Sequence, residues 1–294
     1  MFHIPDSLKL SARAEQRLRS LPQSRISPTR FIIFGYLIIV AVGRLLLMLP
    51  ISSRVRVVTP VVDALFTATS ATCVTGLVVY DTYTYWSLFG KLVILTLIQI
   101  GGIGFMTLSI VSVMFMRRKI SLRHRFMMQE SVSAPQVGGI VRMTRFIFFG
   151  TILIEGIGAA LLAVRLCPQK GMVRGLSESV FYSVSAFCNA GFDLMGQTEP
   201  FSSLTSVAAD PLFIGVIMAL VVIGGLGFYV WADIVENKLS FRRYKLNSKL
   251  VLVTSGVLLL GGAVLFALLE WNGDAFAHGT PWQKCLFALF QSVT

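Results

Sequence analysis

Five long apolar runs constrain the fold of this chain more than any other feature. They lie near residues 31–49, 86–116, 146–166, 211–231 and 250–269. Each run is long enough for the ~20 residues that a helix needs to span a bilayer. Hydrophobic residues make up 55% of the chain and charged residues only 14%, so a soluble domain of this size could not bury the apolar surface. The sequence therefore predicts an all-α integral membrane protein with five spanning helices.

A short stretch rich in small and hydroxyl-bearing residues occurs twice between these runs. The copies, residues 63–77 and 178–192, lie 115 positions apart, and each begins with an acid. They share Phe66/Phe181, Ser70/Ser185, Ala71/Ala186, Cys73/Cys188 and Gly76/Gly191. Each copy is too short and too polar to cross a bilayer, so we interpret both as segments that enter the membrane and turn back. Irregular chain at that depth survives only where it lines a cavity.

Around these stretches the sequence repeats a unit of outer helix, short segment and inner helix. The inner helices match at five of six positions, Ile100-Gly-Gly-Ile-Gly-Phe105 against Ile223-Gly-Gly-Leu-Gly-Phe228. We interpret these glycines as helix-packing positions in preference to a gating hinge. The predicted organisation is a basic amino-terminal segment (1–30), a first helix–pore–helix repeat (31–116), a basic loop (117–145), a second repeat (146–232), a second basic loop (233–249) and an incomplete third repeat (250–294).

The basic residues are distributed unevenly along the chain. Of the 26 Lys and Arg residues, 18 fall in residues 1–30, 117–145 and 233–249. All three stretches lie on one side of the membrane if the five runs span it and the short segments return to their own side. By the positive-inside rule that side is cytoplasmic, and so is the amino terminus. The net charge of +12 therefore reflects membrane topology and does not indicate a nucleic-acid partner.

The short segments carry signals for a helix start. Thr59-Pro60 and Thr280-Pro281 place a capping hydroxyl before a proline, and Ser177 is the corresponding cap in the second copy. Asp63 and Glu178 would then lie in the first helical turn, where the helix dipole favours a carboxylate. After each helix we expect extended backbone whose carbonyl groups replace the water around a cation.

The sequence contains no constellation that indicates an enzyme. Cys73, Cys167, Cys188 and Cys285 lack the spacing of a zinc or redox site, and the three histidines are scattered. We interpret Cys73 and Cys188 as small packing residues. No covalent cofactor is expected.

The motifs Ser70-Ala-Thr-Cys-Val-Thr-Gly-Leu77, Ser185-Ala-Phe-Cys-Asn-Ala-Gly-Phe-Asp193 and Phe290-Gln-Ser-Val-Thr294 resemble those of the Trk/Ktr/HKT superfamily of potassium transporters. Within it the chain most resembles the Ktr-type membrane subunit, because only about 30 residues precede the first outer helix. The resemblance implies a potassium-channel-like pseudo-tetramer of four repeats in one chain, of which two complete repeats and the start of a third are present. It also implies backbone carbonyl ligands for potassium at Cys73, Val74, Thr75, Gly76, Asn189, Ala190 and Gly191.

The same resemblance implies potassium uptake across the cytoplasmic membrane by a multi-pass protein. The partners it implies are a second copy of the chain in a homodimer and a cytoplasmic nucleotide-binding regulatory subunit, for which residues 117–145 are the docking candidate. Sodium dependence of transport stays open. In contrast to the family pattern, the third filter and the fourth repeat are missing, so we expect the chain to be the amino-terminal part of a longer protein. The alternatives are a sodium- or ammonium-preferring relative and a non-conducting membrane scaffold.

Three acids have open roles at this stage. Glu155 lies midway along a predicted outer helix, where an ionisable group is costly; we favour a hydrogen bond to a pore helix over a site for a permeating ion. Asp81 and Asp193 lie in the predicted outer mouth, either concentrating cations or standing as solvated loop acids.

Overall fold

The computed structural model describes residues 28–294 apart from 105–139, 198, 239, 272 and 274–279. Within these residues the chain is helical, and the nearest approach to a strand is an isolated bridge between Ser53 and Trp86. The α-helices are α2 (Pro28–Met48), α3 (Val61–Thr72), α4 (Leu88–Ile103), α7 (Ile140–Lys170), α8 (Met172–Phe187), α9 (Pro211–Gly225), α10 (Phe228–Asn237), α11 (Leu246–Glu270) and α12 (Pro281–Val293). Short 3-10 helices cover Pro50–Ser52, Thr205–Val207 and Phe241–Arg243.

Helices lie at all five predicted apolar runs. By length and composition, α7 and α11 are each able to cross a membrane, and α9 with α10 makes a third span if the bent pair is counted as one. The apolar helices α2 and α4 are shorter within the described residues. The prediction of an all-helical protein is therefore confirmed, and the apolar helices are consistent with a membrane protein, although among the described residues only two or three of the five predicted spans are long enough to cross.

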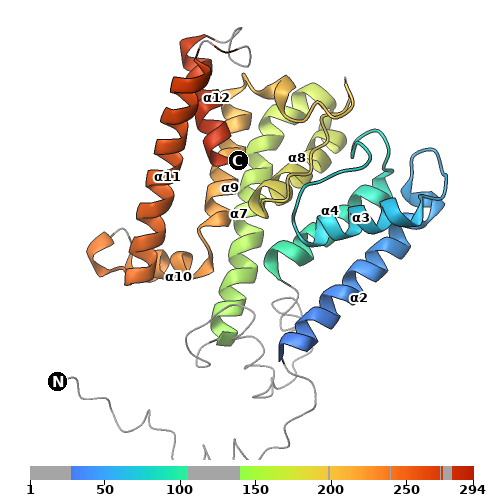
Figure 1. Ribbon diagram of the computed structural model, residues 1–294, viewed down its shortest axis with the longest axis horizontal. Helices are drawn as coiled ribbons and strands as arrows, with labels where there is room; N and C mark the ends of the chain where they lie inside the picture. Colours follow the sequence, from blue (N-terminus) through green and yellow to red (C-terminus); the bar gives the residue numbers. More distant parts are fainter. Residues whose placement is uncertain (1–27, 105–139, 198, 239, 272, 274–279) are drawn as a thin grey trace, which may run out of the picture.

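The described helices form two groups that meet at α8 (Figure 1). In the first group α3 packs between α2 and α4; in the second α8 packs against both α7 and α9. Helix α4 also contacts α7 and α8, so that the groups share an interface. Helices α11 and α12 form a further antiparallel pair beside α9.

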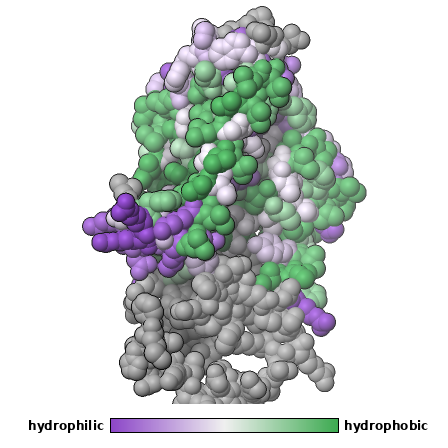
Figure 2. Space-filling view, turned by 60° about the vertical axis from the view of Figure 1, so that its left-hand side comes forward, coloured by the Kyte–Doolittle hydropathy of each residue, from purple (hydrophilic) through white to green (hydrophobic). Residues whose placement is uncertain are grey.

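Much of the outer surface is apolar. Figure 2 shows hydrophobic residues over the upright helices and hydrophilic residues gathered near the end where α10 lies. Helix α11 buries none of its apolar window, and its exposed side chains include Leu250, Val253, Val257, Leu260 and Val264. This pattern fits contact with lipid, where outward apolar side chains carry no cost.

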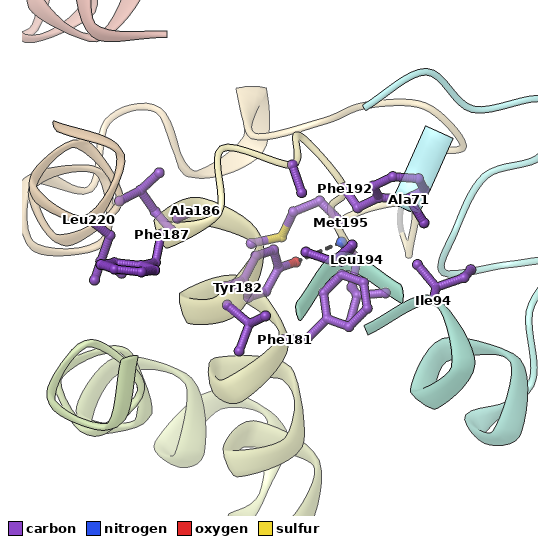
Figure 3. Close-up of a cluster of buried hydrophobic side chains, with 14 of the residues drawn as sticks. Ala71, Ile94, Phe181, Tyr182, Ala186, Phe187, Phe192, Leu194, Met195 and Leu220 are labelled. Carbon is purple, nitrogen blue, oxygen red and sulfur yellow. Dashed lines mark hydrogen bonds between the residues drawn. The ribbon is translucent and has the colours of Figure 1, made fainter. Parts of the chain in front are cut away.

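The core lies around α8, the helix of the second short stretch. Buried side chains from α3, α4, α8, α9 and the loop after α8 meet there (Figure 3). The Tyr182 hydroxyl accepts a hydrogen bond of 3.1 Å from the backbone N–H of Leu194, which ties this loop to the helix. The carboxyl-terminal half of α8, Phe181–Phe187, is buried throughout, and this packing holds the chain that follows the helix in a fixed place.

Two of the predicted helix starts are wrong. Helix α8 begins at Met172, with Gly171 at a φ of 85° as its N-cap, so Ser177 lies inside the helix and donates to the Arg174 carbonyl. Glu178 is consequently beyond the first turn, where it pairs with Lys170 and Arg174. Helix α3 has Pro60 at its N-cap without a side-chain cap. The Thr280 cap is confirmed, because Thr280 and Gln283 form a capping box at α12.

The second inner helix is not the straight span that its apolar run suggests. It breaks between α9 and α10 with a bend of 94°, and Gly227 has a φ of 84° at the break. The first inner helix ends at the equivalent Gly104, with a φ of 88°. A left-handed residue cannot continue an α-helix, and glycine adopts that conformation without strain.

Candidate functional site

The two short stretches have the same local structure. We call residues 73–76 segment one and residues 189–191 segment two. After α3, the N–H of Thr75 donates to the Ser70 carbonyl at 3.0 Å; after α8, the N–H of Ala190 donates to the Ser185 carbonyl at 2.7 Å. Both segments therefore fold back on the last turn of the helix before them.

The serine at the same place in each copy fixes the far end of its segment. Ser70 Oγ donates to the Leu77 carbonyl at 2.7 Å, and Ser185 Oγ donates to the Phe192 carbonyl at 2.6 Å. In the sequence these serines are shared by both copies, but no role was predicted for them. Their recurrence at the same distance before the glycine is the signal from which a structural role could have been predicted.

Both segments alternate between left-handed and ordinary backbone. Val74 and Asn189 have φ values of 58° and 56°, and Gly76 and Gly191 have φ values of 75° and 71°. The residues between them, Thr75 and Ala190, are not left-handed. The prediction of extended backbone is therefore wrong at these residues, because every second residue is left-handed. A β-branched residue such as Val74 adopts positive φ only when its surroundings enforce it.

The segments meet at their glycines. A Cβ atom built on Gly76 would lie 2.7 Å from the Ala190 carbonyl oxygen and 3.1 Å from the Gly191 Cα. A Cβ atom on Gly191 would in turn lie 3.2 Å from the Gly76 Cα. Backbones that are 115 residues apart in sequence are thus in contact without side chains between them.

Glycines of α4 and α9 pack directly against the carboxyl ends of α3 and α8. A side chain on Gly101 of α4 would overlap the Thr72 carbonyl, and one on Gly224 of α9 would overlap the Phe187 carbonyl. Thr72 and Phe187 are the last residues of α3 and α8. The packing role predicted for the glycine cluster is confirmed at these positions, whereas Gly104 and Gly227 serve as helix breaks.

The two equivalent cysteines differ in their surroundings. Cys73 is exposed, so its prediction as a packing residue is wrong. Cys188 is half-buried, packs against Gly102 of α4 and lies 3.9 Å from a carboxylate oxygen of Glu155. Among the described residues no three His, Cys, Asp or Glu side chains gather as metal ligands.

Glu155 joins three helices beside segment two. Its carboxylate accepts hydrogen bonds of 3.1 and 3.0 Å from Gln99 Nε2 of α4, and its backbone carbonyl accepts 2.6 Å from Ser183 Oγ of α8. The hydrogen bond that was expected to the helix of the second short stretch, α8, is therefore made by the Glu155 backbone. The shortest hydrogen bonds of the Glu155 side chain go to Gln99 of α4.

Asp81 and Asp193, the two acids predicted for the outer mouth, differ in burial and in their hydrogen bonds. Asp81 is buried and accepts from the backbone N–H groups of Thr84 at 2.7 Å and Phe201 at 3.0 Å. Burial acts to raise the pKa of Asp81, but these hydrogen bonds hold it below its ordinary value. It is therefore not a solvated acid. Asp193 is half-buried, and burial together with the charge of Asp81 raises its pKa, although the N–H of Met195 opposes the shift.

A cavity of about 300 Å³ adjoins segment two. Its lining includes Asn189, Gly191 and Asp193 from the second copy and Phe290 and Thr294 from the end of α12. The start of the predicted third repeat thus lies beside the second segment. A water molecule or an ion in this cavity would contact residues of segment two and Asp193.

Tyr83 is an interaction centre that the sequence did not indicate. Arg54, Lys91 and Arg174 place their cationic groups 4.9, 4.3 and 5.2 Å from the centre of its ring. Because Arg174 belongs to α8, the ring links the loop of the first copy to the helix of the second.

The amino-acid sequence matches the family described as TrkH, cation transport protein, over residues 10–272. The chain belongs to the TrkH family. Segments one and two therefore belong to a member of a family of cation transport proteins. The proteins of this family are transporters and not enzymes.

Curated relatives share much of this TrkH-family sequence. It is 40% identical over 275 residues to the potassium/sodium uptake protein NtpJ of Enterococcus hirae and 40% identical over 273 residues to the Ktr system potassium uptake protein B of Bacillus subtilis. Each alignment covers 92% of this chain and 59% of the relative. The corresponding protein of Vibrio alginolyticus is 33% identical, with 100% of this chain and 61% of the relative covered. The chain thus spans about three fifths of these relatives.

Proposed function

We propose that this chain forms part of the ion pathway of a transporter that takes potassium into the cell across the cytoplasmic membrane. Segments one and two would supply two sides of a selectivity filter, with Cys73, Val74, Thr75 and Gly76 opposite Asn189, Ala190 and Gly191. The printed names of the relatives, which are potassium or potassium/sodium uptake proteins, support the choice of ion.

The observation that carries the proposal is the contact between Gly76 and Gly191. Alternate left-handed residues turn successive peptide planes so that neighbouring carbonyl groups can face the same side. Rings of such carbonyls replace the hydration shell of a cation in a filter. The carboxyl ends of α3 and α8 adjoin these segments, and the negative end of a helix dipole favours a cation.

The repeat organisation is part of the same proposal. We assign residues 31–116 and 146–232 to two helix–pore–helix repeats and 250–294 to the start of a third, within a potassium-channel-like pseudo-tetramer. Residues 1–30, 117–145 and 233–249 would face the cytoplasm. The matched hydrogen bonds of Ser70 and Ser185 and the matched contacts of Gly101 and Gly224 support a repeat.

The proposed partners follow from the resemblance of the sequence to Ktr-type membrane subunits. They are the lipid bilayer, a second copy of the chain in a homodimer, and a cytoplasmic nucleotide-binding regulatory subunit. The docking candidate, residues 117–145, lies mostly outside the described residues. Whether sodium drives or regulates transport is a separate question that uptake with and without sodium answers.

Sodium is the second candidate for the transported ion, because the name of the Enterococcus relative includes it. A filter whose backbone is spaced for potassium holds sodium less well, since sodium is smaller and keeps more of its water. Measured competition between the two ions therefore separates the candidates.

The experiment is growth rescue of potassium-uptake-deficient cells by the complete gene, with initial uptake of each ion measured in the same cells. We expect growth at low external potassium and potassium uptake that exceeds sodium uptake at equal concentrations. Normal membrane abundance with neither uptake nor rescue would favour a non-conducting scaffold. Uptake of sodium in preference to potassium would assign the sodium candidate.

A further inference from the structure

Glu155 is a buried acid whose hydrogen-bond partners among the described residues are all neutral. Its side chain, on the membrane-spanning α7, is 7% exposed. It meets the Gln99 amide from α4 and the Cys188 thiol at the end of α8. Helix α9 packs on the same part of α7 with Leu220, which approaches Gly158 one turn further on.

Glu155 forms none of the ion pairs found between described residues. The ion pairs found in the described part of the chain are Arg165–Asp210, Lys170–Glu178 and Arg174–Glu178. An ionised carboxylate in a membrane interior is strongly disfavoured without a positive partner, and such a group usually becomes neutral instead. The surroundings therefore favour a carboxyl group that keeps its proton.

The Gln99 amide gives an independent argument for a proton. Its Nε2 group lies almost equally close to both carboxylate oxygens, at 3.1 and 3.0 Å, while its Oε1 atom is buried without a hydrogen-bond partner. A carboxylate has only acceptors, so it cannot satisfy Oε1. A protonated carboxyl group has an O–H that is available to donate to Oε1, while its carbonyl oxygen accepts from Nε2. The resulting acid–amide pair leaves neither group unsatisfied.

The same pair is connected to segment two. Ser183 of α8 donates to the Glu155 carbonyl, and Cys188, which touches Gly102 and the Glu155 carboxyl group, directly precedes Asn189. The inner helix of the first copy, the outer helix of the second and the start of segment two therefore converge on Glu155.

We propose that Glu155 carries a proton at neutral pH and, paired with Gln99, is a positioning residue for segment two. Its effect on ion selection rests on the proposed function, whereas its protonation does not. The pair holds α4 against the end of α8, and removing either hydrogen-bonding side chain lets segment two shift relative to segment one.

Infrared spectroscopy of the full-length protein in lipid vesicles tests the protonation without any transport assay. At neutral pH the wild type should show the C=O absorption of a protonated carboxyl group, and the difference spectrum against Glu155→Gln should contain it. If the difference spectrum contains the bands of an ionised carboxylate instead, Glu155 is charged and the proposal fails.

Uptake measurements test the positioning role. Glu155→Gln keeps a neutral side chain with one donor and one acceptor for Gln99, so its potassium uptake and potassium-to-sodium ratio should stay within about twofold of wild type. Glu155→Leu and Gln99→Leu should each lower the ratio by about fivefold, and the double variant should be no worse than the more affected single one, because both remove the same pair.

Failure of the proposed protonation, of the Glu155–Gln99 pair and of the proposed function would each give a different result. Loss of uptake in Glu155→Gln at normal abundance would show that the negative charge is needed, as for a cation ligand, and would overturn the proposal. Additive losses in the double variant would show that the two residues do not act as a pair. Absence of potassium uptake in the wild type would refute the proposed function, while the infrared result would still decide the protonation.

Discussion

At the scale of single residues, Asp81 joins the loops that follow the two segments. Its carboxylate accepts from Thr84 in its own loop and from Phe201 in the loop after segment two. It also lies against Gly196, where a side chain would overlap it. One carboxylate thus fixes the relative position of two loops that are 120 residues apart.

Replacing Asp81 by Asn should destabilise the protein by about 1–3 kcal/mol, because the amide group turns a donor toward backbone N–H groups. The pKa of Asp81 is held below its ordinary value of 3.8 in the folded state. Its stabilising effect is therefore complete above that value and is lost as the pH falls below it. Thermal unfolding in detergent should show a constant difference between wild type and variant from pH 5 to pH 8 that shrinks below pH 4. An equal difference at every pH would contradict the role of the charge.

At the scale of helices, the closest contacts are those of the inner helices with the ends of α3 and α8. Gly101 and Gly224 allow the backbones to touch where any side chain would overlap a carbonyl oxygen. After the contact of Gly224 with Phe187, the bend between α9 and α10 changes the direction of the chain by 94°. One glycine cluster therefore supplies both a packing position and a break.

Gly224→Ala should destabilise the protein by about 1–3 kcal/mol through overpacking against the Phe187 carbonyl. Gly256→Ala in α11 is the matched control, because a Cβ there meets no described atom within 4 Å, and replacement of a helical glycine there should stabilise by about 0.5–1 kcal/mol. Thermal unfolding of the two variants checks this. Equal stability of both would show that the inner helix does not press on α8 as described.

The sequence predicted the helices of the apolar runs and the equivalence of the two segments because both depend on local pattern. It did not predict that α8 begins at Met172, since the start depends on a left-handed Gly171 and on partners of Glu178 that an N-cap rule does not consider. The partner of the Glu155 carboxylate was missed for a similar reason. Gln99 lies 56 residues away, and no spacing rule links an amide in one helix to an acid in another.

At the scale of the whole molecule, the charge distribution determines the expected orientation in the membrane. The largest group of hydrophilic residues in Figure 2 lies near α10, and the chain between α10 and α11 carries Arg242, Arg243 and Lys245. This loop is one of the three basic stretches that the positive-inside rule assigns to the cytoplasm.

Reporter fusions should therefore be cytoplasmic after Arg125 and after Lys245, and external after Gln197. Enzymatic reporters that are active on only one side of the membrane make the measurement direct. An external reporter after Arg125 would mean that the chain crosses the membrane once more or once less in the first repeat, and it would refute the re-entrant interpretation of residues 63–77.

If segments one and two select the ion, the potassium-to-sodium uptake ratio must depend on their glycines, and this ratio can be measured for glycine variants in the full-length protein. Gly76→Ser puts a side chain within 3 Å of the Ala190 carbonyl at a left-handed position. Gly191→Ser, at a left-handed position too, puts its Cβ 3.2 Å from the Gly76 Cα. Each should lower the ratio by about tenfold, equivalent to ~1.4 kcal/mol, at unchanged protein abundance. Gly150→Ser, where a Cβ meets no described atom within 4 Å, should leave it unchanged. Wild-type ratios in both Gly76→Ser and Gly191→Ser would show that these segments are loops and not a filter.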